Sequence, residues 1–303
     1  MTGRRVISVP DLVAAIDEHE AVGFRLTTIS PADDPRRADM DGPEAIRLER
    51  AADAPPTTGR AGMVYRDLIP SRLGGAVIAS HISIPEGGPV PDYVHHHDIR
   101  FQMIFCHAGW VKVVYEDQGD PFVMAPGDCV IQPPGIRHRV LESGDGLEVV
   151  EIGAPAEHDT HRDHELQLPN GVGDPDRAWQ GQRFVRHEYA DDRWTDSPDP
   201  GWELQHFGVE DATGGVAAVR LARTAGAAPP LRTHDFELFV GFVRSGELDY
   251  IGPSGVTTVG PGEAVVVPAG EEFALGARTP TEMLIATLPA SESQRSGRAD
   301  RAC

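Results

Sequence analysis

Three histidines and one glutamine stand in two short segments, and their side chains could together hold a metal ion. In the segment HHHDIRFQ, His95 and His97 are two residues apart, so a strand there would point both imidazoles to the same face. A turn after Asp98 would bring Gln102 alongside them, and the later PPG turn would place His138 nearby from a further strand. Three neutral imidazoles and one amide oxygen form a nitrogen-rich site that suits a divalent first-row metal.

The elements that must position these side chains are short strands. The 303 residues include 33 glycines and 26 prolines, which interrupt helices and favour turns. From about Ala61 the chain consists of short apolar runs separated by Gly and Pro. The same pattern returns after a polar, proline-rich interval that ends near Pro200. The pattern predicts an all-β protein. One helix is expected before the strands, over residues 9–23.

The two β-rich regions repeat each other. At an offset of 137 residues, His97 aligns with His234 and Gly109 aligns with Gly246. Downstream, the segment PGDCVIQPPG aligns with PGEAVVVPAG at an offset of 135 residues. A single two-residue deletion between the blocks reconciles the two offsets. The chain therefore contains two copies of one β domain.

The spacing of the first copy resembles the two sequence motifs of the cupin superfamily. The first motif runs HxH(x)3-4E(x)6G, and the second runs G(x)5PxG(x)2H(x)3N. By this resemblance the metal ligands are His95, His97, Gln102 and His138. The resemblance implies two tandem cupin barrels, each a jelly roll or double-stranded β-helix, preceded by a short N-terminal helix and an arm.

The first copy departs from the family pattern at two positions. Gln102 stands where cupins usually carry glutamate, and Glu142 stands where the second motif usually carries asparagine. Losing the carboxylate removes one negative charge and leaves a site that resembles the three-histidine cupins, which hold ferrous iron or other divalent metals. Two roles stay open for Gln102: it ligates the metal, or it acts in catalysis by orienting a ligand or water.

The second copy departs further from the metal-binding pattern. His234 takes the place of His97, but Arg232, Phe239 and Phe273 replace the other three candidate ligands. One histidine cannot hold a metal, so this copy resembles the degenerate half of a bicupin, with the two phenylalanines as interior packing. An alternative is a metal-free pocket in which Arg232 and His234 bind an anion.

These patterns divide the chain into five expected segments. In order they are an N-terminal helix and extended arm over 1–60, the metal-binding cupin domain over 61–156, a connection over 157–202, the degenerate cupin domain over 203–290 and a disordered tail over 291–303. In the connection, His158, His161 and His164 recur every third residue. Their acidic neighbours favour solvated side chains over a second metal site.

Composition excludes several classes of partner. The 27 basic and 47 acidic side chains give a formal charge of −20, whereas nucleic acid and anionic membranes need a positive surface. Neither is therefore expected as a partner. Three cysteines without a CxxC pair indicate no disulfide framework and no thiolate zinc site. No apolar run reaches the length of a signal peptide or membrane span, so we expect a cytoplasmic protein.

The ligand set supports three hypotheses about function. Three histidines leave metal positions for O2 and a small organic substrate, so the first is an Fe(II) dioxygenase that works in the N-terminal barrel. The second uses Zn, Ni or Mn as a Lewis acid for isomerase, cyclase or lyase chemistry. The third is a cupin that binds a small ligand without catalysis. The N-terminal arm could also join two copies as a homodimer.

Overall fold

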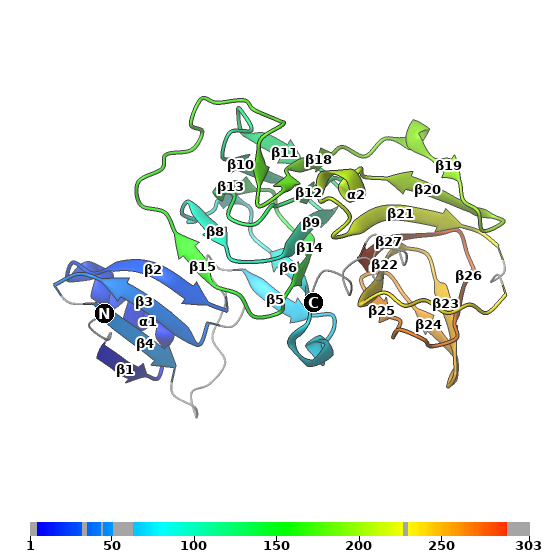
Figure 1. The fold of residues 1–303 in the computed structure, drawn as a ribbon, viewed down its shortest axis with the longest axis horizontal. Helices are drawn as coiled ribbons and strands as arrows, with labels where there is room; N and C mark the ends of the chain where they lie inside the picture. Colours follow the sequence, from blue (N-terminus) through cyan, green and yellow to red (C-terminus); the bar gives the residue numbers. More distant parts are fainter. Residues whose placement is uncertain (1–4, 32–34, 44, 51–62, 227–229, 290–303) are drawn as a thin grey trace, which may run out of the picture. The chain divides into compact units, whose positions relative to one another are not determined.

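The computed structural model describes residues 5–31, 35–43, 45–50, 63–226 and 230–289. Within them the chain is mostly strand, and it forms two compact units (Figure 1). The first unit comprises Met1–Asp67, Ser71–Asp128 and Gln132–Gln180, and the second comprises Leu68–Pro70, Cys129–Ile131 and Gly181–Cys303. The all-β fold class expected from the sequence is confirmed.

One sheet of the first unit continues from the N-terminal segment into the barrel. Its strand order is β1-β4-β3-β2-β15-β8-β13-β10-β11, and neighbours are antiparallel except for β1 and β4. The strands are β1 (Arg5–Val9), β2 (Arg25–Ser30), β3 (Arg37–Asp41), β4 (Ile46–Arg50), β15 (Thr160–Arg162), β8 (His95–His97), β13 (His138–Ser143), β10 (Val111–Tyr115) and β11 (Phe122–Met124), with β7 (Gly88–Pro89) also paired to β13. The strand with two of the histidines therefore lies directly beside the strand that begins at the third.

A second antiparallel sheet closes the first barrel. Its order is β9-β14-β6-β5, formed by β9 (Phe101–Ala108), β14 (Leu147–Ala154), β6 (Ile78–Ile84) and β5 (Val64–Asp67). Side chains from both sheets line one internal pocket. The short strand β12 (Cys129–Ile131) pairs with β18 (Val185–His187), and both belong to the second unit.

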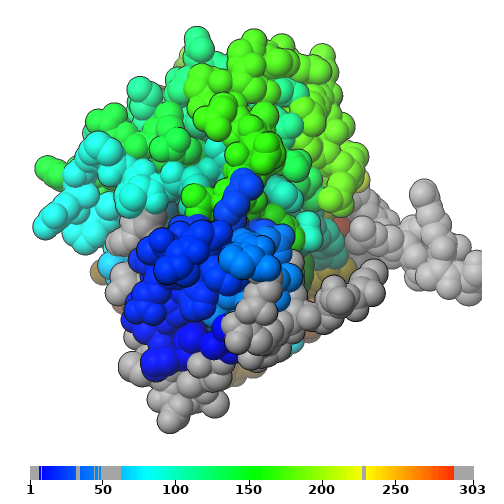
Figure 2. Space-filling model, turned by 90° about the vertical axis from the view of Figure 1, so that its left-hand side faces the viewer, coloured from blue at the N-terminus to red at the C-terminus, as the bar shows by residue number. Residues whose placement is uncertain are grey.

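The N-terminal helix forms where the apolar periodicity predicts it. Helix α1 (Leu12–Ala21) buries Leu12, Ala15 and Ile16 against β2, β3 and β4, and Asp11 caps its first turn by accepting a backbone hydrogen bond of 3.0 Å. Figure 2 shows this N-terminal segment in blue beside cyan and green residues of the same unit. Among the helices of the described residues, none is long and apolar enough to cross a membrane.

The extended arm, predicted over residues 28–60, forms strands of a sheet in its described part. That stretch supplies β3, β4 and the end of β2. The sheet continues into the barrel because Ile29 on β2 pairs with Thr160 on β15, which is remote in sequence. Local periodicity carries no sign of such a pairing. Residues 51–62 and the predicted tail over 291–303 lie outside the described residues.

The second unit is built from two further antiparallel sheets. One has the order β19-β20-β21-β27-β22-β25, and the other has the order β24-β23-β26. Their strands are β19 (Thr195–Asp196), β20 (Trp202–His206), β21 (Ala218–Thr224), β27 (Thr281–Leu288), β22 (Leu238–Ser245), β25 (Ala264–Val266), β24 (Gly255–Val259), β23 (Leu248–Gly252) and β26 (Ala274–Ala277). Of the remaining short elements, η2 (Arg72–Gly75) and β16 (Ala178–Trp179) belong to the first unit, and β17 (Gln182–Arg183), η3 (Asp191–Arg193) and α2 (Val209–Ala212) belong to the second. An apolar core that includes Phe239 and Phe273 fills the space between the two sheets.

Backbone hydrogen bonds repeat between the two copies at the offsets read from the sequence. In the first copy the Gln132 amide donates to the Gln102 carbonyl, and in the second Val267 donates to Phe239, each at 3.0 Å. The donors are 135 residues apart and the acceptors 137. The bond from Gly135 to the His97 carbonyl likewise recurs as a bond from Gly270 to the His234 carbonyl. The internal repeat is therefore structural as well as sequential.

Candidate metal centre

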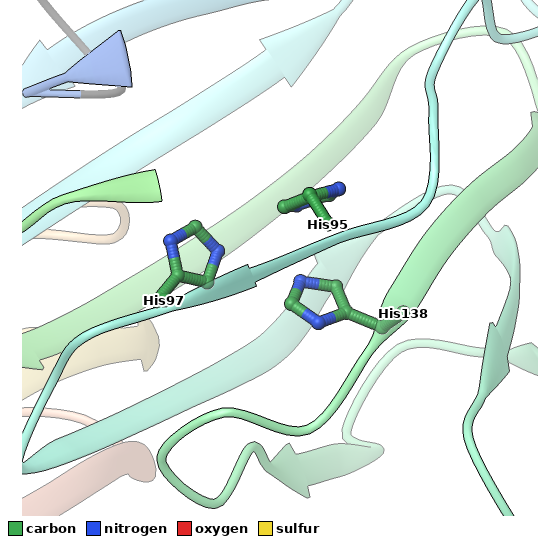
Figure 3. A group of neighbouring side chains, drawn as sticks. All are labelled: His95, His97 and His138. Carbon is green, nitrogen blue, oxygen red and sulfur yellow. The ribbon is translucent and has the colours of Figure 1, made fainter. Parts of the chain in front are cut away.

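His95, His97 and His138 form a cluster of buried imidazoles inside the first barrel. The first two lie two residues apart on β8, and His138 pairs with His95 across the neighbouring strand (Figure 3). One potential ligand nitrogen of each ring lies within 4.8 Å of those of the other two. None of the three residues is more than 6% exposed. The three histidines singled out from the sequence thus meet in space.

The second nitrogen of each ring has its own partner. His95 and His138 each donate an Nδ1 hydrogen bond to the backbone carbonyl two residues earlier, at 2.7 and 3.0 Å. A carbonyl can only accept, so Nδ1 carries the proton and Nε2 keeps the lone pair. His97 Nδ1 lies 2.8 Å from the buried hydroxyl of Thr160. Such anchoring of the far nitrogen is typical of metal-binding histidines, so the donor set fits a divalent first-row metal.

The PPG turn places His138 at the start of β13. The Ile136 amide donates to the Pro133 carbonyl at 3.1 Å, and Gly135 has a φ of 85°, which a residue with a Cβ rarely adopts. The Gly135 amide also donates to the carbonyl of His97 at 3.2 Å. The turn before the third histidine is therefore tied directly to the strand that carries the other two.

Gln102 lies in the same pocket and is only 2% exposed. Its Nε2 donates to Glu151 Oε1 at 2.6 Å, which fixes the orientation of the amide because a carboxylate accepts and does not donate. Within the described residues the Gln102 amide oxygen makes no hydrogen bond. That oxygen is the group that Gln102 can offer to a metal or to a ligand.

The pocket that contains this cluster has a volume of about 100 Å³. Apart from the three histidines, Gln102 and Glu151, its walls are mostly apolar. They are formed by Met63, Tyr65, Ile82, Ile84, Ile104, Val111, Val113, Tyr115, Met124, Gln132, Arg139, Val140, Leu147 and Val149. Apolar walls around a few convergent polar groups are typical of small-molecule sites.

Glu151 and Tyr115 are among the polar pocket residues that the sequence analysis did not single out. Glu151 lies on β14 at the same strand parity as Leu147 and Val149, so a carboxylate on the inward face of a buried strand was the available signal. Tyr115 stacks on His138 with ring centroids 5.5 Å apart, and its hydroxyl accepts a hydrogen bond from Gln132 at 2.8 Å. No motif marks Tyr115, because its contact depends on the pairing of β10 with β13.

The interpretation of the three later histidines as solvated side chains is wrong. His158 is 8% exposed, and its ring centroid lies 5.3 Å from that of His97. His161 stacks on His96 with centroids 5.1 Å apart. His164 Nε2 lies 2.7 Å from a backbone carbonyl on β2. Acidic neighbours in the sequence did not reveal that β15 is an internal strand of the sheet.

The outward face of β8 carries a second group of polar side chains. His96, Asp98 and His161 have potential ligand atoms within 4.8 Å of one another, and His161 Nε2 lies 3.0 Å from Asp98 Oδ2. Burial, followed by the positive charges of Arg137 and His161, lowers the pKa of His96 to about 4. His96 is therefore neutral at pH 7, and its stacked ring joins β8 to β15.

The comparisons with known proteins agree with this geometry. Residues 80–153 match the family described as cupin domain, a stretch that contains all three clustered histidines. The solved structure of salicylate 1,2-dioxygenase from Pseudaminobacter salicylatoxidans superposes with a TM-score of 0.57 at 14% identity, and covers 75% of this chain and 73% of its own. Residues 80–153 therefore form a cupin domain. No curated protein sequence matches this chain.

A second solved structure supports the same fold. A variant of the same salicylate 1,2-dioxygenase, crystallised in complex with gentisate, gives a TM-score of 0.60 at 16% identity. The superposition covers 80% of this chain and 78% of the solved chain. At these identities the likeness shows the shared fold, and the two-barrel architecture implied by the motif resemblance is confirmed.

Proposed function

We propose that the first barrel of this bicupin binds Fe(II) and that the chain is a dioxygenase for a small organic substrate. The observation that supports this most is the set of three buried imidazoles, two of which have the tautomer needed to offer Nε2. Iron held by three neutral histidines would keep positions for O2 and substrate and would supply the electrons that O2 activation needs. His95, His97 and His138 would hold it.

The protein around the histidines would bind and orient the substrate. The apolar walls exclude water from the pocket, which strengthens the polar interactions within it. Glu151 holds the Gln102 amide by its nitrogen, so the amide oxygen either ligates the metal or accepts a hydrogen bond from a substrate hydroxyl. Tyr115 keeps the His138 ring in place by stacking.

We propose a small planar aromatic compound as the first substrate class to test. The solved structure with the TM-score of 0.60 was crystallised with gentisate, which has this shape. The pocket of this chain offers matching chemistry, because apolar side chains from β6, β9 and β10 and the ring of Tyr115 line it. Salicylate and gentisate are therefore the first compounds to assay.

Elemental analysis tests the metal site. The protein is purified without an affinity tag or chelator, beside His138→Ala and the control His206→Ala, which removes an exposed histidine of the second unit. We expect about one divalent metal per chain in the wild type and the control, and a loss of at least tenfold in His138→Ala. Circular dichroism confirms that each variant is folded.

Oxygen consumption then tests the chemistry. The wild type reconstituted with Fe(II) is expected to consume O2 when salicylate, gentisate or a related aromatic acid is added, and His138→Ala is not. Turnover of the same compound under strict anaerobiosis would instead indicate Lewis-acid chemistry. Metal content that is substoichiometric, and equal in the wild type and His138→Ala after reconstitution, would overturn the proposal.

A further inference from the structure

The second barrel contains a pocket whose wall includes Arg232 and Phe239, the residues that align with His95 and Gln102 of the first barrel. This pocket has a volume of about 240 Å³. Arg232, which aligns with His95 in the internal repeat, lies in its wall, and a second arginine, Arg220, faces it from β21. Most of the remaining wall is apolar and is formed by Trp202, Leu204, Ala222, Phe239, Leu275 and Ile285. The wall of this pocket thus carries two cationic side chains on a mostly apolar surface.

Arg220 is a half-buried cation without an ion-pair partner in the described part of the chain. It lies on the same face of β21 as Ala222, and that face points into the barrel. No carboxylate in the described ranges lies within 4.0 Å of its guanidinium, although Asp199 and Glu210 act on it from farther away. Burial, followed by the positive charge of Arg232, lowers the pKa of Arg220. Guanidinium groups remain charged nonetheless, so the site carries an uncompensated positive charge.

Arg232 is already paired. Its Nη1 donates to Asp199 Oδ2 at 2.5 Å, and its guanidinium lies over the ring of Phe273, 5.4 Å from the centroid. These contacts hold Arg232 in position while Asp199 neutralises its charge. The pocket therefore has a net charge of one, located at Arg220, in a chain whose formal charge is −20.

His234 is not available to this pocket. The Phe236 amide donates to His234 Nδ1 at 3.2 Å, so Nδ1 carries the lone pair. His234 Nε2 then carries the proton and donates to the Val267 carbonyl at 3.1 Å. Both ring nitrogens are used within the barrel, and the ring packs between Phe239 and Phe273. The sequence suggested a pocket in which Arg232 and His234 bind an anion. In the structure, Arg220 takes the place of His234 beside Arg232 in the pocket wall.

We propose that the second barrel binds a small organic carboxylate with an apolar body. The carboxylate contacts Arg220, with Arg232 beside it, and the body packs against Trp202, Phe239 and Leu275. A guanidinium binds a carboxylate through charge-assisted and often bidentate hydrogen bonds. One unpaired cation balances one negative charge, whereas a phosphate dianion would leave a second charge buried without a partner. The site is independent of the metal centre in the first barrel.

Isothermal titration calorimetry with benzoate tests this proposal on the full-length protein. The variant is Arg220→Gln, and the matched control is Arg223→Gln on the same strand, whose side chain is outside the pocket and pairs with Glu203. We expect benzoate to bind the wild type and the control equally, and to bind the variant at least tenfold more weakly. Because Arg220→Gln removes a half-buried, unpaired charge, its melting temperature without benzoate should equal or exceed that of the wild type.

His138→Ala separates this site from the first barrel. If benzoate also enters the first pocket, Arg220→Gln loses one site and keeps the other, while His138→Ala keeps the site at Arg220. Inorganic phosphate should compete at least tenfold less effectively than acetate. The proposal is overturned if millimolar benzoate gives no binding, if Arg220→Gln binds like the wild type, or if phosphate competes as well as acetate.

Discussion

Gln102 and Glu151 together restore the negative charge that the first cupin motif loses. The motif usually supplies a carboxylate at the position of Gln102, and here an amide stands there. Glu151 projects from the adjacent strand β14 and accepts a 2.6 Å hydrogen bond from that amide. The carboxylate is thus one hydrogen bond away from the position that the motif assigns to it. It would balance the charge of a metal ion in the pocket, and it fixes the direction of the amide oxygen.

Replacing Glu151 with glutamine should weaken metal binding. Glu151→Gln removes the charge and allows the Gln102 amide to turn over, while the side-chain volume stays almost the same. Residues that orient ligating groups typically change metal affinity by about 10–100-fold when they are replaced. We expect a decrease of about tenfold in the affinity for Fe(II) or Mn(II), measured by competition with a fluorescent chelator.

Glu142→Gln is the matched control, because it makes the same chemical change at an exposed position of β13. Its affinity should match that of the wild type. Equal affinity in Glu151→Gln would show that the carboxylate contributes nothing to the centre.

At the scale of elements, an ion pair joins the turn before β13 to the end of β15. Arg137, which precedes His138, donates from Nε to Asp163 Oδ2 at 3.1 Å. Burial alone would raise the pKa of Asp163, but the backbone N–H groups of Leu166 and Glu165, together with Arg137, outweigh it and lower that pKa. The charged carboxylate is therefore favoured in the folded state.

Asp163→Asn should lower the free energy of unfolding at pH 7 by about 1 kcal/mol, since the pair is partly screened by solvent. A carboxyl whose folded pKa is depressed stabilises the fold above its unfolded pKa of about 3.8, and that contribution is lost as the pH falls through the lower folded pKa. Urea unfolding from pH 7 to pH 2 should thus show a smaller acid-dependent loss in the variant than in the wild type. Asp120→Asn, at an exposed position, should leave the profile unchanged. Identical profiles for Asp163→Asn and wild type would contradict the assignment.

At the scale of the whole molecule, the sequence predicted the features that depend on neighbouring residues or on the internal repeat. His95 and His97 follow from strand alternation, and the two offsets of the repeat return as matching backbone hydrogen bonds. Glu151 could not be identified, because it enters from a strand outside both motifs. Arg220 could not be identified either, since its lack of a partner depends on which strands close the second barrel. The N-terminal strands were missed because Ile29 finds its partner at Thr160.

The second barrel should unfold independently of the metal centre. Phe273 is 1% exposed and contacts Phe239 and His234 in the core, so Phe273→Ala should cost about 3–5 kcal/mol of the free energy of unfolding of that unit. The metal content should not change, because the three clustered histidines and the groups that anchor them belong to the first unit. Calorimetry should show that the melting temperature of one transition is lowered. The control is Leu231→Ala, which truncates a side chain at a 55% exposed position, and the metal content of the two variants should be the same. Loss of metal in Phe273→Ala would show that both units unfold together, because metal held only by residues of the first unit is lost only when that unit also unfolds.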